Sequence, residues 1–186
     1  MTLGNRPEVA LRPDPDQGRR GRFGAATGGA AAVEFALVVL PLIMLIFAIL
    51  ELALVFWLSA LMDDAVNTAA RKIKTGQVTA STEAAATAFK GVICDEVKLL
   101  ASDCTANLAV DVRTFATLNA IDSSPPMING VVDPAAMTFV PGGPSDVVLV
   151  RAYYRWPIFT PGLTMAMGST RLITATTTFR NEPYEP

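Results

Sequence analysis

Histidine is absent from this chain of 186 residues, and cysteine occurs only twice, at Cys94 and Cys104. Without histidine there can be no His-dependent triad, and the usual general base near neutral pH and the commonest transition-metal ligand are missing. Two cysteines are too few for a four-thiolate zinc site, and no Gly-x-Ser-x-Gly signature occurs. We therefore expect no metal, no cofactor and no enzymatic activity.

Charge is also scarce, at 17% of residues against about 25% in an average soluble chain. The deficit is concentrated in residues 35–62, where Glu51 is the only charged residue. The net charge of −2 and the lack of a basic face give no reason to expect a nucleic-acid partner. This composition excludes disorder for most of the chain and argues against an ordinary cytosolic enzyme.

The apolar run of 28 residues, 35–62, predicts a transmembrane helix. About 20 apolar residues cross a bilayer, whereas the apolar region of a secretory signal has only about 7–15. The alternative is a buried helix of a globular core. At ~1.5 Å per residue the run is ~40 Å long, so its outer end should emerge from the lipid, with Trp57 at the interface.

The polar leader before this run sets the expected orientation. It carries five arginines against three acids, and Arg19, Arg20 and Arg22 lie nearest the apolar run. Positive charge close to a membrane helix favours the cytoplasmic side. We expect a single-pass protein of the bacterial inner membrane, with the N-terminus in the cytoplasm and the C-terminal domain in the periplasm.

The remaining pattern predicts an α+β fold. The first helix should continue to about Lys74 and stop at Gly76, and a second, amphipathic helix should run from Ser81, as its cap, to about Leu100. Strands are expected at residues 108–113, 137–140, 146–156 and 170–180, with a loop at 119–134. Three parts follow: a basic leader (1–29), the transmembrane helix with its extension (30–76), and an extracytoplasmic α+β domain with a small antiparallel sheet (77–186).

The junction Thr27-Gly28-Gly29-Ala30-Ala31-Ala32-Val33-Glu34-Phe35 joins the leader to the helix. It resembles a type III signal of the type IV prepilin class, in which a membrane peptidase cuts after a glycine. Cleavage between Gly29 and Ala30 would make Glu34 the fifth residue of the mature chain and Phe35 the sixth. Cleavage after Gly28 would place the acid sixth, so we prefer Gly29.

Two acids on the predicted helix need partners or water. A carboxylate in hydrocarbon costs about 2.5–3.5 kcal/mol at the bilayer centre. The α-amine freed by cleavage lies about one helical turn from Glu34, and it could neutralise that carboxylate within one subunit or between packed subunits. The alternative is that Glu34 is tolerated near headgroups. Glu51 should lie near the outer interface, either paired with a basic group on a partner helix or solvated.

A block of residues on and after the apolar helix carries a family resemblance: Glu34-Phe35-Ala36-Leu37, Pro41, Glu51-Leu52, Ala65, Asn67 and Ala69-Ala70-Arg71. Over about residues 24–75 the chain resembles TadE-like proteins, the minor pilins or pseudopilins of the Tad secretion and Flp pilus system. Residues 174–184, which end in Arg180-Asn181-Glu182-Pro183-Tyr184, look more loosely like the end of such proteins.

This resemblance implies a pilin-like fold and a structural role in Flp (type IVc) pilus assembly. The implied partners are a TadV-like prepilin peptidase, a TadF-like minor pilin, the Flp major pilin and the Tad inner-membrane platform. The protein would remain in the inner membrane or also enter the pilus. The competing interpretation is an unprocessed, membrane-anchored periplasmic adaptor of a secretion or envelope complex.

The two cysteines are ten positions apart, on the side of the membrane helix expected to be periplasmic. A chain that folds back after a helix ending near Leu100 could bring the two sulfurs together. In an oxidising compartment a disulfide between Cys94 and Cys104 is the default interpretation. A redox-active pair would normally show Cys-x-x-Cys spacing, which is absent here.

Overall fold

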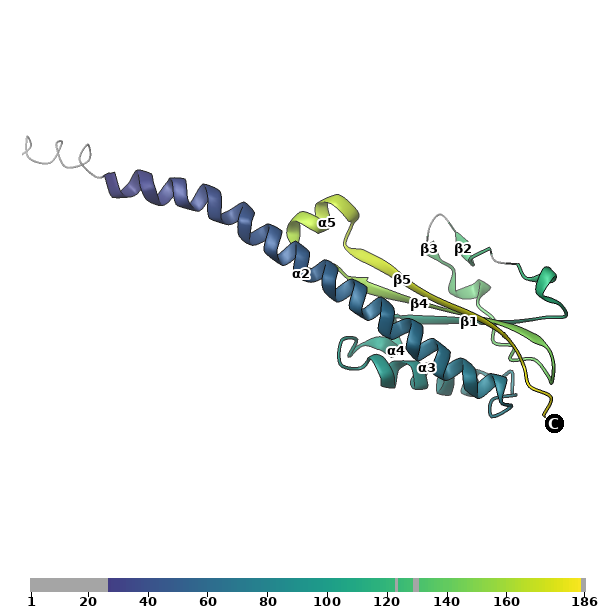
Figure 1. Ribbon diagram of the computed structural model, residues 1–186. Coiled ribbons are helices and arrows are strands. Elements are labelled where there is room, and N and C mark those ends of the chain that lie inside the picture. The colour runs from purple at the N-terminus through teal and green to yellow at the C-terminus, as the bar shows by residue number, and fades with distance from the viewer. Residues whose placement is uncertain (1–26, 123, 129–130, 185–186) are drawn as a thin grey trace, which may run out of the picture. The chain divides into compact units, whose positions relative to one another are not determined.

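The computed structural model describes residues 27–122, 124–128 and 131–184 (Figure 1). The arginines of the leader, Ser123, and the Asn129-Gly130 pair of the expected loop lie outside the described residues. The elements are α2 (Thr27–Lys74), α3 (Glu83–Val97), α4 (Cys104–Asn107), β1 (Leu108–Phe115), β2 (Met127–Ile128), β3 (Val131–Val132), β4 (Val147–Pro157), α5 (Pro161–Met167) and β5 (Thr170–Arg180), with short 3₁₀ turns at Leu118–Ala120 and Pro134–Ala136.

The predicted α+β class is confirmed: a long apolar helix and a second helix precede small antiparallel sheets. The expected strand at 137–140 is reduced to one parallel bridge between Val112 and Phe139. In this bridge the N–H of Val112 donates to the carbonyl of Thr138, and the carbonyl of Val112 accepts the N–H of Val140. The sequence analysis did not predict α5, α4 or the β2–β3 pair, which lies within the expected loop at 119–134. These elements are too short to show a clear periodicity.

The main sheet has the order β1-β4-β5, and both pairings are antiparallel. Tyr154 of β4 lies opposite Leu108 of β1 and Ile173 of β5. Because β4 is central and covered on both faces, Tyr153 and Tyr154, which point to opposite faces, are 2% and 1% exposed. Alternate side chains of this strand therefore point to two buried faces, and neither face is exposed to solvent.

The described residues up to Leu45 and those from Ile46 onward fall into two compact units. In the second unit, α3 and the remainder of α2 cover one face of the sheet (Figure 1). The buried stripe of α2 is Leu58, Met62, Ala65, Val66, Ala69, Ala70 and Ile73. Its spacing of three and four residues is that of one helix face, and its alanines allow close approach to the neighbouring elements. α3 adds Phe89, Ile93 and Val97 to the same core.

The ends of these two helices have specific caps. Gly76 has φ +73°, its N–H donates to the carbonyl of Ile73, and the N–H of Gln77 donates to that of Lys72. This Schellman arrangement needs a residue in the left-handed region and so explains the predicted stop. The cap of α3 is Thr82 rather than the expected Ser81, because the Thr82 hydroxyl accepts the N–H of Ala85 at 3.2 Å.

Candidate processing junction and anchoring contacts

The junction residues lie on the first turns of α2. Gly29, Ala30, Glu34 and Phe35 are all exposed, Phe35 by 69%. A Cβ atom built on Gly29 would meet nothing within 4 Å. Within the described residues, Glu34 makes no hydrogen bond or ion pair. The junction therefore presents an open backbone and a carboxylate available to another chain or to a new amine.

α2 is the one helix, among the residues that the structure describes, that is long and apolar enough to cross a membrane. The most apolar 18-residue window in Gly29–Lys74 has a mean hydropathy of 2.9, and only 6% of it is buried. A core helix of a water-soluble domain would bury such a window. The helix could thus anchor the chain in a membrane.

Glu51 differs from both alternatives considered for it. Glu51 is only 6% exposed. Its carboxylate accepts the backbone N–H groups of Phe159 at 2.6 Å and Thr160 at 2.8 Å. Neither a basic group on a partner helix nor bulk water describes these contacts. The carboxylate instead joins α2 to the segment that leads into α5, with charge-assisted hydrogen bonds to two amides.

Cys94 and Cys104 form a disulfide with a Cα–Cα distance of 5.5 Å. Cys94 lies in the last turn of α3, and Cys104 opens α4, directly before β1. Both residues are buried in the core. The bond therefore fastens the helical layer to the start of the sheet.

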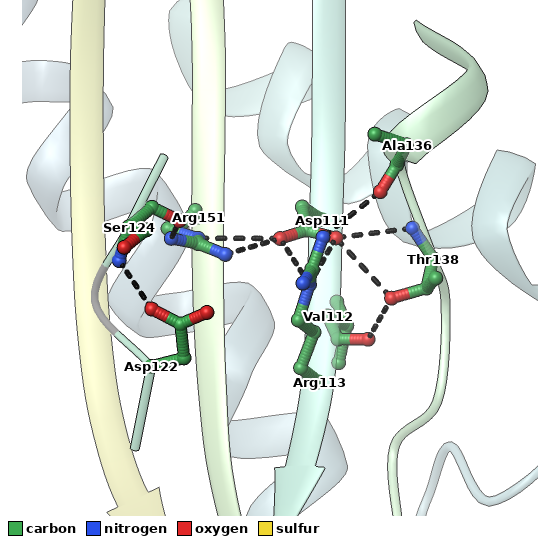
Figure 2. Close-up of polar contacts among 8 residues, drawn as sticks. All are labelled: Asp111, Val112, Arg113, Asp122, Ser124, Ala136, Thr138 and Arg151. Carbon is green, nitrogen blue, oxygen red and sulfur yellow. Dashed lines mark hydrogen bonds and ion pairs between the residues drawn. The ribbon is translucent and has the colours of Figure 1, made fainter. Parts of the chain in front are cut away.

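The outer face of the sheet contains a buried ion network around Asp111 (Figure 2). Asp111 is fully buried; its carboxylate accepts from Arg151 Nη2 at 2.8 Å and from Arg113 Nε at 3.0 Å. It also accepts the N–H of Thr138 at 3.0 Å. Both carboxylate oxygens thus accept hydrogen bonds, two of the donors being arginines, and a buried charge is tolerated under this condition.

The same two arginines hold the long connection between β1 and β4 against the sheet. Arg113 donates to the carbonyl of Ala136 at 2.9 Å, and Arg151 donates to that of Ser124 at 2.7 Å (Figure 2). The Ser124 N–H in turn donates to Asp122, which lowers the pKa of that carboxyl. This network serves the fold, because its groups all have partners inside the domain.

A second polar contact, which is partly buried, lies at the start of α4, where Asp103 is the N-cap residue. The Tyr154 hydroxyl donates to Asp103 at 2.9 Å, beside the disulfide residue Cys104. Burial raises the pKa of Tyr154, and the hydrogen bond to the Asp103 carboxylate raises it further. The phenol is therefore a structural donor at neutral pH rather than an acid–base group.

The C-terminal tail packs on the end of α2. The N–H of Glu182 donates to the carbonyl of Lys74 at 2.9 Å, and the Asn181 side chain donates to the carbonyls of Pro141 and Gly143. A Cβ at Gly76 would lie 2.7 Å from the Tyr184 ring. These contacts give a physical reason for residues 180–184, which the sequence analysis singled out only by resemblance.

The described residues thus combine one exposed apolar N-terminal helix with a small α+β domain. A family model described as TadE-like protein matches residues 29–71. The resemblance is confirmed over those residues, and this similarity implies a pilin-like function associated with the Tad system and the Flp pilus. No curated protein and no solved structure matches the chain.

Sequence reasoning missed the contacts that hold the domain together. The Asp111 network left one signal, an acid and two arginines that alternate with apolar residues along two predicted strands. The Glu51 contact left a weaker one, a single acid within a run of 28 residues. Neither signal identifies the partner, since both pairings join residues 40 or more positions apart.

Proposed function

We propose that this protein is a minor pilin or pseudopilin that acts in Flp pilus assembly by the Tad system after cleavage between Gly29 and Ala30. The observation that supports this most directly is the position of the family match. It begins at Gly29, five residues before the exposed carboxylate of Glu34, which has no hydrogen-bond or ion-pair partner in the part of the chain that the structure describes. The peptidase would be TadV-like.

Cleavage would create a positive charge that can pair with the Glu34 carboxylate. The α-amine of Ala30 would lie about one helical turn from the carboxylate, on the same helix or on a neighbouring subunit. In a low-dielectric environment a paired amine and carboxylate are far less costly than either charge alone. Glu34 and Phe35 would then contact the helix of a TadF-like minor pilin or the Flp major pilin during assembly on the inner-membrane platform.

The domain from Ile46 onward fits a minor rather than a major subunit. It contains a sheet, α3 and a disulfide, in addition to the helix. A domain of this size needs space outside a closely packed fibre of small helical subunits. A structural role in assembly is therefore favoured over enzymatic activity.

The test is N-terminal sequencing of the protein co-expressed with its peptidase. The mature chain should begin at Ala30, and Gly29→Leu should abolish cleavage, because a branched side chain beside the scissile bond obstructs close backbone approach. Gly29 has open space around it, so this variant should fold normally. Ala36→Leu adds similar bulk to an exposed position seven residues away and should be cleaved normally.

Glu34→Ala separates processing from assembly. It should be cleaved at close to the normal rate but support fewer pili, since the freed amine loses its partner. A protein that keeps its leader while the same peptidase processes other substrates contradicts the proposal. That result favours the second candidate, an unprocessed membrane-anchored adaptor, for which Gly29→Leu should have no effect.

A further inference from the structure

An exposed apolar surface lies at α5, and the contacts described above involve none of its side chains. Phe159, Met165 and Met167 are 70%, 90% and 45% exposed, and Leu163 is half-buried beside them. We call these four residues the α5 apolar surface. Residues 156–170 contain no charged side chain, whereas Arg155 and Arg171, which flank them, are both exposed. Single exposed apolar side chains are ordinary, but a continuous group of this kind marks an interaction surface.

Glu51 determines where this surface lies along α2. Its carboxylate accepts the N–H groups of Phe159 and Thr160, the two residues that precede α5. α2 and α5 also line one apolar groove, formed by Leu52, Val55, Phe56, Leu163, Met167 and Leu172, with Arg171 beside it. The α5 apolar surface is therefore held at the level of Glu51.

That level corresponds to the outer edge of a bilayer. Residues 29–50 contain no charged residue except Glu34, and their large apolar side chains are exposed. These 22 residues make a helix ~33 Å long, close to the ~30 Å thickness of a hydrocarbon core. Phe56 and Trp57 follow Glu51 and are 72% and 51% exposed, as expected for aromatic side chains among headgroups.

We infer that the α5 apolar surface lies in the outer interface of the membrane that α2 spans. Its apolar side chains insert below the headgroups, while Arg155 and Arg171 lie among the lipid phosphates. Glu51 acts as a positioning residue that holds α5 beside the helix. The occupant is lipid because the surface is continuous along the groove with the exposed apolar side of α2. This inference rests on the membrane anchoring in the proposed function, but not on cleavage or pilus assembly.

The test compares single cysteines in the full chain, labelled with an environment-sensitive fluorophore under non-reducing conditions that keep Cys94 and Cys104 paired. Met165→Cys reports the α5 apolar surface. Leu118→Cys is the matched control: it is 65% exposed and follows the end of β1 that pairs with the start of β4. The length of β4 separates that end from α5 by ~30 Å. Leu42→Cys reports whether α2 is inserted.

In vesicles of phosphatidylcholine and phosphatidylglycerol, iodide should quench the Met165 label several-fold less than the Leu118 label. Brominated lipid should quench the Met165 and Leu42 labels but not the Leu118 label. Equal iodide quenching at Met165 and Leu118, with Leu42 in lipid, overturns the inference and leaves anchoring intact. A Leu42 label in water overturns both. Protection of Met165 that grows with protein density, without quenching by brominated lipid, indicates a second copy and also overturns it.

Discussion

The two segments of α2, residues 29–50 and residues 51–74, differ in how their apolar side chains are exposed. Between residues 29 and 50 no residue is buried, and large apolar side chains are exposed all around the helix. Between residues 51 and 74 the buried residues form one stripe, and the opposite side carries Asp63, Asp64, Asn67 and Arg71. The first segment of the helix is therefore apolar on all sides, whereas the second is apolar on one side only.

This difference shows how one helix is suited to two solvents. An all-round apolar helix is stable only where no side faces water, whereas a striped helix needs a partner on one side and water on the other. The transition occurs at Glu51, whose carboxylate is satisfied by amides of the domain. We expect substitutions before and after this residue to affect different properties.

A leucine-to-alanine substitution in each segment tests this comparison. The change in the second segment should have the largest effect on the free energy of unfolding. Leu58 is fully buried, so Leu58→Ala should lower the free energy of unfolding of the domain by about 2–5 kcal/mol. Leu42 is 51% exposed, so Leu42→Ala should leave it unchanged. Urea titration in detergent micelles, followed by the fluorescence of buried Trp156, measures both. Equal losses would mean that residues 29–50 also pack against the domain.

The disulfide supports only the second segment, through α3. Replacing Cys94 and Cys104 by serine should cost about 3 kcal/mol, because a cross-link over ten residues restricts the unfolded chain. Insertion of residues 29–50 into vesicles should not change. Alkylation of the unmodified protein provides the control: both thiols should react only after reduction. Full labelling without reduction would show that the stripe of α2 is held by packing alone.

The elements that depend on a local sequence pattern could be predicted from the sequence. The contacts that depend on distant partners could not. The apolar run, the stop at Gly76 and the amphipathic second helix follow from composition and spacing within a few turns. The strand at 146–156 was also evident from alternation, although its two faces are both buried. Burial of the second face comes from the connection between β1 and β4, which has no periodic signal.

Glu51 shows the same limit at a single residue. Its acidity within an apolar run indicated an interface, but its partners, the amides of Phe159 and Thr160, are more than 100 positions away. The segment at 156–170 contains Pro161, Gly162 and Gly168, so it was not expected to form a helix. Only the pairing of β4 with β5 brings it back to α2. Long-range strand pairing is the information that local patterns lack.

The two acids of α2 offer a sharper version of the comparison. Glu51→Ala should lower the free energy of unfolding by about 1.5–3 kcal/mol, because the amides of Phe159 and Thr160 lose a charged acceptor. Glu34→Ala should not affect this quantity, since Glu34 has no partner among the described residues. Chemical unfolding of both variants in detergent measures the difference. A stable Glu51→Ala protein would indicate that α5 is held by the apolar groove alone.

The two glycines at the ends of α2 should show the smallest difference. Gly76→Ala should cost about 1–2 kcal/mol, because an L residue is disfavoured at φ +73°. A further loss is expected because the added Cβ would lie 2.7 Å from the Tyr184 ring, so the C-terminal tail must move. Gly29→Ala has open space and lies within the helix, so it should be neutral or slightly stabilising. Thermal unfolding of both variants tests this, and the double variant Gly76→Ala/Tyr184→Ala separates the two costs at Gly76. If truncating Tyr184 recovers none of the loss, backbone strain alone is responsible, and the tail does not constrain the end of α2.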